Sequence, residues 1–98
     1  MTVRILDFEW DDINIPHLEL GHGITPAEAE EVFVEAPEFR RLRRKRYAVL
    51  GPTADGRFLV LVFKLKPRGR ARVLTGWDME PIDRRMYERL RRKGGGQK

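Results

Sequence analysis

The 98-residue sequence contains no cysteine, which excludes both a disulfide framework and a thiolate metal site. Its two histidines, His17 and His22, are five residues apart and do not fit the ligand spacing of a zinc motif. The sequence has no glycine-rich phosphate loop, no apolar run long enough to span a membrane, and no apolar signal segment after Met1. We therefore expect a cytoplasmic protein with no metal site and no cofactor.

The charges are strongly segregated along the chain. Residues 1–38 contain ten acidic residues and one arginine, whereas residues 39–98 contain five acidic residues and nineteen Lys or Arg. Such a basic half suits RNA, DNA or an acidic protein partner, although a solvated surface with pairing between the halves has the same composition. The length indicates one domain with a modest core, which we place at residues 1–93, followed by a flexible Gly-rich tail at residues 94–98.

The apolar residues concentrate in a predicted β-hairpin. Residues 47–50 and 58–65 are apolar runs, and residues 53–56, with the sequence Thr-Ala-Asp-Gly, supply the positive φ of a tight turn between them. The second run is nearly continuous, whereas a strand with one solvated face alternates polar and apolar residues. We therefore predict that residues 58–65 form an interior strand that is covered on both faces.

The first third of the chain predicts a short strand and a short helix. Residues 3–8 alternate loosely, as in a strand. A helix is expected over residues 12–20, with Asp11 or Asp12 as its N-cap and Gly21 after its last residue. Pro16 requires this helix to begin close to it, because proline is tolerated in the first turn of a helix.

The second helix has clearer signals at both ends. Thr25 is the expected N-cap, Pro26 takes the first helical position, and Glu28 completes a capping box. Pro37 ends the helix. An apolar stripe and a glutamate-rich face between these ends indicate that one side of the helix packs against the core.

The basic half predicts a further strand and a last helix. Residues 40–46 place six cations around one leucine and suit a solvated loop or the end of a strand. Residues 70–77 alternate and predict a strand antiparallel to residues 58–65, and the last helix runs from about residues 78–81 to Lys93. The expected fold is α+β, with an antiparallel sheet of about four strands in the order β-α-α-β-β-β-α.

Several residues suit metal-free cleavage of RNA, which needs a base, an acid and cations around the phosphate. The residues able to transfer protons are His17, His22, Tyr87 and Glu88. The cations on or beside predicted strands, which can hold phosphate, are Arg57, Lys64, Arg70 and Arg72. Each of these residues, taken alone, is more typical of a loop hydrogen bond or a solvated surface than of a catalytic site.

Short segments in a fixed order carry a family resemblance. They are Trp10-Asp11, His22-Gly23-Ile24, Val32-Phe33, Gly56-Arg57, Arg72-Val73-Leu74-Thr75 and Tyr87. The sequence thereby resembles the BrnT family, which are small toxins of type II toxin–antitoxin modules. The resemblance implies a RelE-like fold, metal-independent RNA cleavage and neutralisation by a cognate antitoxin protein.

The resemblance also implies particular site residues. Its best positional matches, His22, Arg57 and Arg72, are expected to meet in one cleft as catalytic residues, with Tyr87 as a further candidate. The expected RNA contacts are Arg40, Arg41, Arg43, Arg44, Lys64, Arg70 and Trp77. Two hypotheses follow, namely an endoribonuclease toxin, or a non-catalytic relative that binds RNA or a protein partner through its basic face.

The sequence departs from the family pattern in two places. It has Thr75-Gly76-Trp77 where the family usually has Ser/Thr-Ala-Arg, so that an active-site arginine is replaced by Trp77. It also has Asn14 where the family usually has a lysine, and Pro16 is unusual there. Losing an arginine from a phosphate site removes stabilisation of the transition state, and this departure favours the binding hypothesis.

Overall fold

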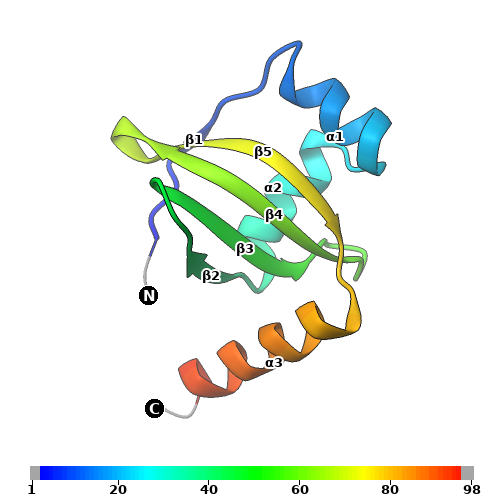
Figure 1. Ribbon diagram of the computed structural model, residues 1–98, viewed down its shortest axis with the longest axis vertical. Helices are drawn as coiled ribbons and strands as arrows, with labels where there is room; N and C mark the ends of the chain where they lie inside the picture. The colour runs from blue at the N-terminus through cyan, green and yellow to red at the C-terminus, as the bar shows by residue number, and fades with distance from the viewer. Residues whose placement is uncertain (1–2, 96–98) are drawn as a thin grey trace.

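The structure is a computed structural model that describes residues 3–95. Its elements are β1 (Asp7–Phe8), α1 (Asn14–His22), α2 (Pro26–Glu35), β2 (Glu38–Arg41), β3 (Arg46–Pro52), β4 (Phe58–Lys66), the 3₁₀ turn η1 (Pro67–Gly69), β5 (Arg70–Asp78) and α3 (Pro81–Gly95). The strands form one sheet in the order β1-β5-β4-β3-β2. Helices α1 and α2 cover one face, called here the inner face, and α3 lies against the opposite, outer face (Figure 1).

The predicted α+β class and the central hairpin are confirmed. β4 lies in the middle of the sheet and pairs antiparallel with both β3 and β5. On the inner face, Leu59, Leu61 and Phe63 are fully buried, and on the outer face Val60 is buried against α3. The nearly continuous apolar run therefore reflects full burial of β4 on the inner face and partial burial on the outer face, where Phe58 and Val62 are half-buried.

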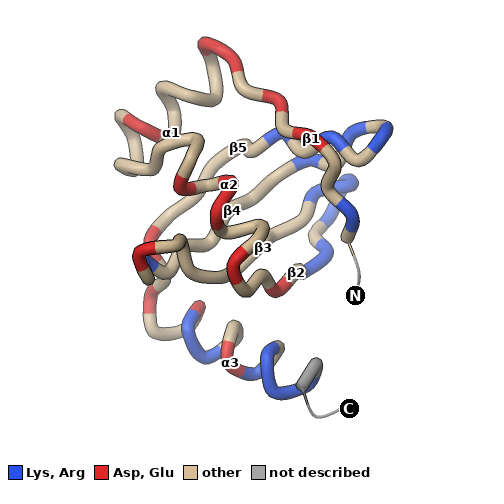
Figure 2. Tube along the Cα trace, turned by 180° about the vertical axis from the view of Figure 1, so that it is seen from behind, with Lys and Arg blue, Asp and Glu red and all other residues tan. Residues whose placement is uncertain are grey.

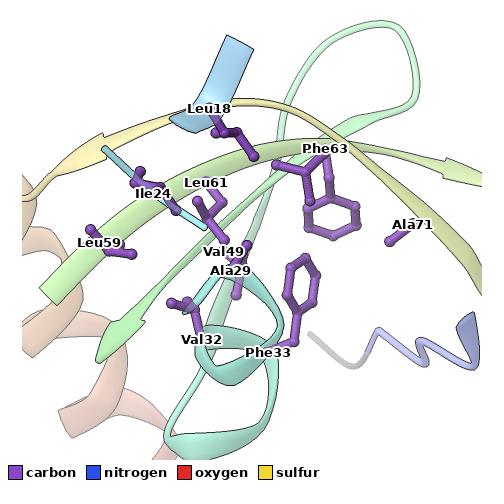
Figure 3. Close-up of a cluster of buried hydrophobic side chains, with 11 residues drawn as sticks. Leu18, Ile24, Ala29, Val32, Phe33, Val49, Leu59, Leu61, Phe63 and Ala71 are labelled. Carbon is purple, nitrogen blue, oxygen red and sulfur yellow. The ribbon is translucent and has the colours of Figure 1, made fainter. Parts of the chain in front are cut away.

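The inner core is built around aromatic rings. The ring of Phe63 meets that of Phe33 from α2 edge-on, with the centroids 5.0 Å apart, and the ring of Tyr47 from β3 stacks on it at 5.6 Å. Leu18 from α1 and Ile24 from the following loop are fully buried in the same cluster (Figure 3). The two helices of the acidic half are thus held on the sheet by one continuous apolar cluster.

The sheet has five strands and is mixed, whereas about four antiparallel strands were expected. The additional strand is β2, part of the segment expected as a loop or strand end, and its Phe39 packs against the ring of Phe63 at 6.2 Å. The first strand is two residues long, not six, and pairs in parallel with β5. Val3 and Ile5 before it pack against the core without joining the sheet.

Helix α1 begins and ends about two residues later than expected. The N-cap is Ile13, so the prediction of Asp11 or Asp12 for that position is wrong, although the Asp11 carboxylate accepts hydrogen bonds from the backbone N–H of Ile13 and of Asn14, at 2.9 and 3.1 Å. The helix ends before Gly23, whose φ of 65° lies in the left-handed region. Gly21 was predicted for that position and is instead helical, because two glycines lay close enough for either to end the helix.

The other helices match the expectations closely. The capping box of α2 is confirmed, with both reciprocal bonds between Thr25 and Glu28 present. Helix α3 continues through Gly94 and Gly95, and the remainder of the expected tail, residues 96–98, lies outside the described residues. No helix within residues 3–95 is long and apolar enough to cross a membrane.

Candidate functional site

The segregated charges of the sequence become separate surfaces in the fold. Acidic residues gather on α1, α2 and the segment before α1, whereas basic residues gather on α3 and on the hairpin ends at one end of the sheet (Figure 2). On the outer face, Lys64 of β4 lies directly opposite Arg46 of β3 and Arg72 of β5. This row of three, together with Arg40, which lies opposite Ala48, forms the basic floor of the outer face.

Most of the predicted RNA contacts are exposed and available for a ligand. Arg40, Arg41, Arg43, Arg44 and Lys64 are all exposed, and none of them forms an ion pair with another residue in the described chain, 3–95. Arg70 differs, because its guanidinium lies 3.7 Å from the carboxylate of Asp7. Unpaired exposed cations of this kind suit contacts with phosphate.

Trp77 lies where the open part of the outer face meets α3. It is 37 % exposed, and its indole N–H donates to the Asp83 carboxylate at 3.1 Å. Together with Val62, Leu42 and Ile82 it lines an apolar groove of about 270 Å³ between the sheet and α3. An exposed indole in this position suits stacking against a base, although it carries no charge to neutralise phosphate.

Arg72 is tied to two carboxylates and is not free for a ligand. Its Nη1 donates to the Asp11 carboxylate at 2.6 Å and to that of Glu9 at 2.9 Å, and its side chain is 17 % exposed. Lys66 also donates to Glu9, at 2.8 Å. The hydrogen bond from Arg72 holds the pKa of Asp11 well below its usual range, and backbone N–H groups at the start of α1 lower it further.

The ion pairs of Arg72 predict an acid-dependent stability. The pKa values of Asp11 and Glu9 are lowered in the fold, so their contribution is complete above the unfolded pKa of about 4 and is lost as the pH falls through the folded values. In Arg72→Gln we therefore expect a lower Tm than wild type near neutral pH and a shrinking difference as the pH approaches about 2. Thermal unfolding followed by circular dichroism measures this. A difference independent of pH would show that Arg72 acts through packing alone.

Arg57 joins three parts of the chain. Its guanidinium makes two hydrogen bonds to the Asp78 carboxylate, at 2.8 and 3.0 Å, and it also pairs with Glu28 at 3.3 Å. Its Nη1 donates to the carbonyl of Gly23 at 2.8 Å and its Nη2 to that of His22 at 3.4 Å. The hydrogen bonds with Asp78, followed by those with Glu28, raise the pKa of Arg57. Arg57 thus fixes the loop between α1 and α2 to the end of β5.

Two imidazoles share one hydroxyl at the free part of the β5 edge. The Nε2 atoms of His17 and His22 lie 3.3 and 3.4 Å from the Oγ1 of Thr75, and the ring centroids are 5.5 Å apart. His17 is exposed and His22 half-buried. A hydroxyl can donate to one imidazole Nε2 while it accepts from the other, an arrangement in which the two rings have different tautomers. The sequence identified both histidines as candidates, but gave no signal that Thr75 joins them.

Tyr87 lies on the outer face of the sheet, away from the histidine pair at the β5 edge. It belongs to α3, is buried against Ala48 and Leu50, and donates from its hydroxyl to the Ala36 carbonyl at 2.9 Å. Desolvation by burial is the main cause that raises its pKa. The expected single cleft is therefore only partly formed. Arg57 reaches the backbone of His22, but Arg72 faces the carboxylates before α1, and Tyr87 holds α3 against the sheet.

Within residues 3–95, no three His, Asp or Glu side chains gather closely enough to hold a metal ion. The residues described above offer proton transfer by imidazoles and electrostatic contact by cations.

The mixed sheet, with two helices on one face and one on the other, has a counterpart among solved structures. The structure is similar to the crystal structure of the Brucella abortus ribonuclease toxin BrnT, with a TM-score of 0.60 and 15% sequence identity. The similarity covers 81% of this chain and 99% of the Brucella chain. No family model and no curated protein sequence matches this chain. The resemblance to BrnT that the sequence carries is thus confirmed at the level of the fold.

Proposed function

We propose that this protein is a BrnT-like toxin that cleaves RNA without a metal ion and is held inactive by a cognate antitoxin protein. The observation that carries the proposal is the exposed, unpaired set Arg40, Arg46 and Lys64 on the open outer face of a sheet with the fold of a ribonuclease toxin. Cations in such an arrangement bind a nucleic acid by displacing counterions from its phosphates. An acidic segment of the antitoxin would compete for the same face.

The histidine pair supplies the proton transfers of the proposed reaction. The neutral imidazole takes the proton of the 2′-hydroxyl, the 2′-oxygen attacks the adjacent phosphorus, and the protonated imidazole gives a proton to the departing 5′-oxygen. An imidazole suits both roles because its ring nitrogens can accept a proton or donate one. We assign the two roles to His17 and His22, with Thr75 aligning their Nε2 atoms and Arg57 positioning the loop that follows His22.

Strand β5 connects these histidines to the basic floor. Thr75 and Arg72 are three residues apart on this strand, which corresponds to about 10 Å. A strand of RNA that lies over Lys64 and Arg46 can therefore extend to the histidine pair. Because Arg72 is already bound by carboxylates, Lys64 is the cation that we expect to contact the phosphate first.

The proposal predicts that the protein cleaves RNA in the absence of a metal ion. Wild-type protein should cut single-stranded RNA of mixed sequence in the presence of EDTA. His22→Gln and His17→Gln should each lower the rate by about a hundredfold, the ordinary contribution of a general acid or base. Tyr87→Phe is the matched control, since its ring supports α3, and it should cleave at the wild-type rate. Full activity in both histidine variants would disprove this assignment of the catalytic groups.

The second candidate function is binding of RNA without cleavage. It is favoured by Trp77, which stands where the family usually has an arginine, and by the occupied guanidiniums of Arg57 and Arg72. In that case no cleavage is detected, the protein still binds RNA, and His22→Gln binds as wild type does. The assay above therefore separates the two candidates when it is combined with a binding measurement.

A further inference from the structure

The turns at one end of the sheet share an uncommon backbone conformation. Within residues 3–95, the non-glycine residues with positive φ are Arg44 at 58°, Lys45 at 60° and Arg68 at 65°. In hairpin turns this conformation usually falls to Gly, Asn or Asp, because a larger side chain crowds the backbone. Here all three residues are cations, so these turns combine an uncommon backbone conformation with positive charge.

The three residues lie in neighbouring turns. Arg44 and Lys45 connect β2 to β3, in a turn closed by the hydrogen bond from the Leu42 N–H to the Arg46 carbonyl at 2.8 Å. Arg68 lies in η1, which connects β4 to β5. Because β3 and β4 are adjacent in the sheet, both turns project from the same end, as seen from two sides in Figures 1 and 2.

The tips of these turns carry positive charge that no acidic side chain in the described part of the chain neutralises. The residues concerned, here called the fork cations, are Arg43, Arg44, Lys45, Arg46 and Arg68. All are exposed, and none forms an ion pair within residues 3–95. The cations nearer the base of the second turn are already paired, since Lys66 contacts Glu9 and Arg70 contacts Asp7.

The fork cations lower the stability of the fold in two ways. The left-handed conformation is unfavourable for Arg and Lys, and an Asn-Gly turn would remove that cost. Like charges held close together on neighbouring turns also repel one another. These exposed side chains gain no burial that would offset the two costs, whereas binding of an anionic ligand would relieve the repulsion.

We propose that the two turns form a two-pronged site for the backbone phosphates of single-stranded RNA, a site that rests on the proposed action on RNA. Phosphates are contacted by Arg and Lys regardless of sequence, which matches a row of fork cations with no aromatic ring among them. A protein partner fits less well, because the core of a protein interface is apolar and rich in aromatic residues, whereas the fork cations include no apolar or aromatic side chain. The site continues the row of Arg46 and Lys64 and holds the strand as it leaves the outer face.

The test uses variants that separate charge from backbone strain. Arg44→Asn/Lys45→Gly removes two charges and the strain, so Tm should rise by about 5 °C or more. Its affinity for single-stranded RNA should fall by about tenfold, and the slope of log K against log salt should decrease in magnitude by about 1.4, the value for two lost phosphate contacts. Arg44→Gln/Lys45→Gln, which removes the charge repulsion but keeps the strain, should lose the same affinity with a smaller rise in Tm.

The matched control removes two exposed charges elsewhere. Arg85→Gln/Arg89→Gln, on the solvent side of α3, has the same net charge as the turn variants and should keep the wild-type affinity within about twofold. The inference is overturned if the Asn-Gly variant gains stability and keeps its affinity and salt slope, or if the α3 control loses as much as the turn variants. Wild-type protein that binds no RNA at low salt would instead refute the proposed function itself.

Discussion

Phe63→Ala should lower the free energy of unfolding by about 3–5 kcal/mol, which is a large fraction of the stability of a domain of this size. Phe63 is fully buried at the centre of β4, and its ring contacts those of Phe33, Phe39 and Tyr47. Removing it opens a cavity between the sheet and α2, because side chains from three different elements cannot all move to fill the space. Urea denaturation followed by circular dichroism measures the loss.

The control for this cavity is Val34→Ala on the solvent side of α2. Val34 is 74% exposed, so the substitution should change the stability by less than about 0.5 kcal/mol. A similar small loss in Phe63→Ala would mean that the aromatic cluster is loosely packed and that α2 is held to the sheet by other contacts.

Gly76→Ala should destabilise the protein by about 1–3 kcal/mol, although alanine is the usual residue of the BrnT family at this position. A Cβ atom on Gly76 would lie 2.5 Å from the Cδ2 of Leu61, 3.0 Å from the carbonyl oxygen of Val60 and 3.3 Å from the Cδ1 of Ile24. Leu61 and Ile24 are fully buried, so neither has free space into which to move. The strand backbone must shift instead, which disturbs the pairing of β5 with β4.

Gly21→Ala is expected, in contrast, to stabilise the protein. A Cβ atom on Gly21 meets nothing within 4 Å, and the residue is helical in α1, where alanine is favoured over glycine by about 1 kcal/mol. The two variants should therefore move Tm in opposite directions in thermal unfolding. A rise in Tm for Gly76→Ala would contradict the close contact of β5 with the inner core.

The sequence determined the elements whose signals are local. The capping box of α2 lies within the four residues from Thr25 to Glu28, and the apolar run of β4 is contiguous, so both features can be recognised without knowing their neighbours. The segregation of charge could also be predicted, because the acidic residues of the first half and the basic residues of the second half lie mainly on separate surfaces. The α+β class, the interior hairpin and the basic face were therefore predictable.

Only the tertiary structure decided which of the candidate site residues are free to act. The carboxylates that bind Arg57 and Arg72 most closely, at Asp78 and Asp11, lie 21 and 61 residues away in the sequence. Packing between distant segments also buries Tyr87 of α3 against the sheet and brings the two histidines to one hydroxyl. The composition of the chain determines which charged and proton-transfer groups are present. Whether these groups are free to bind a ligand depends on which partners the fold brings within hydrogen-bond distance.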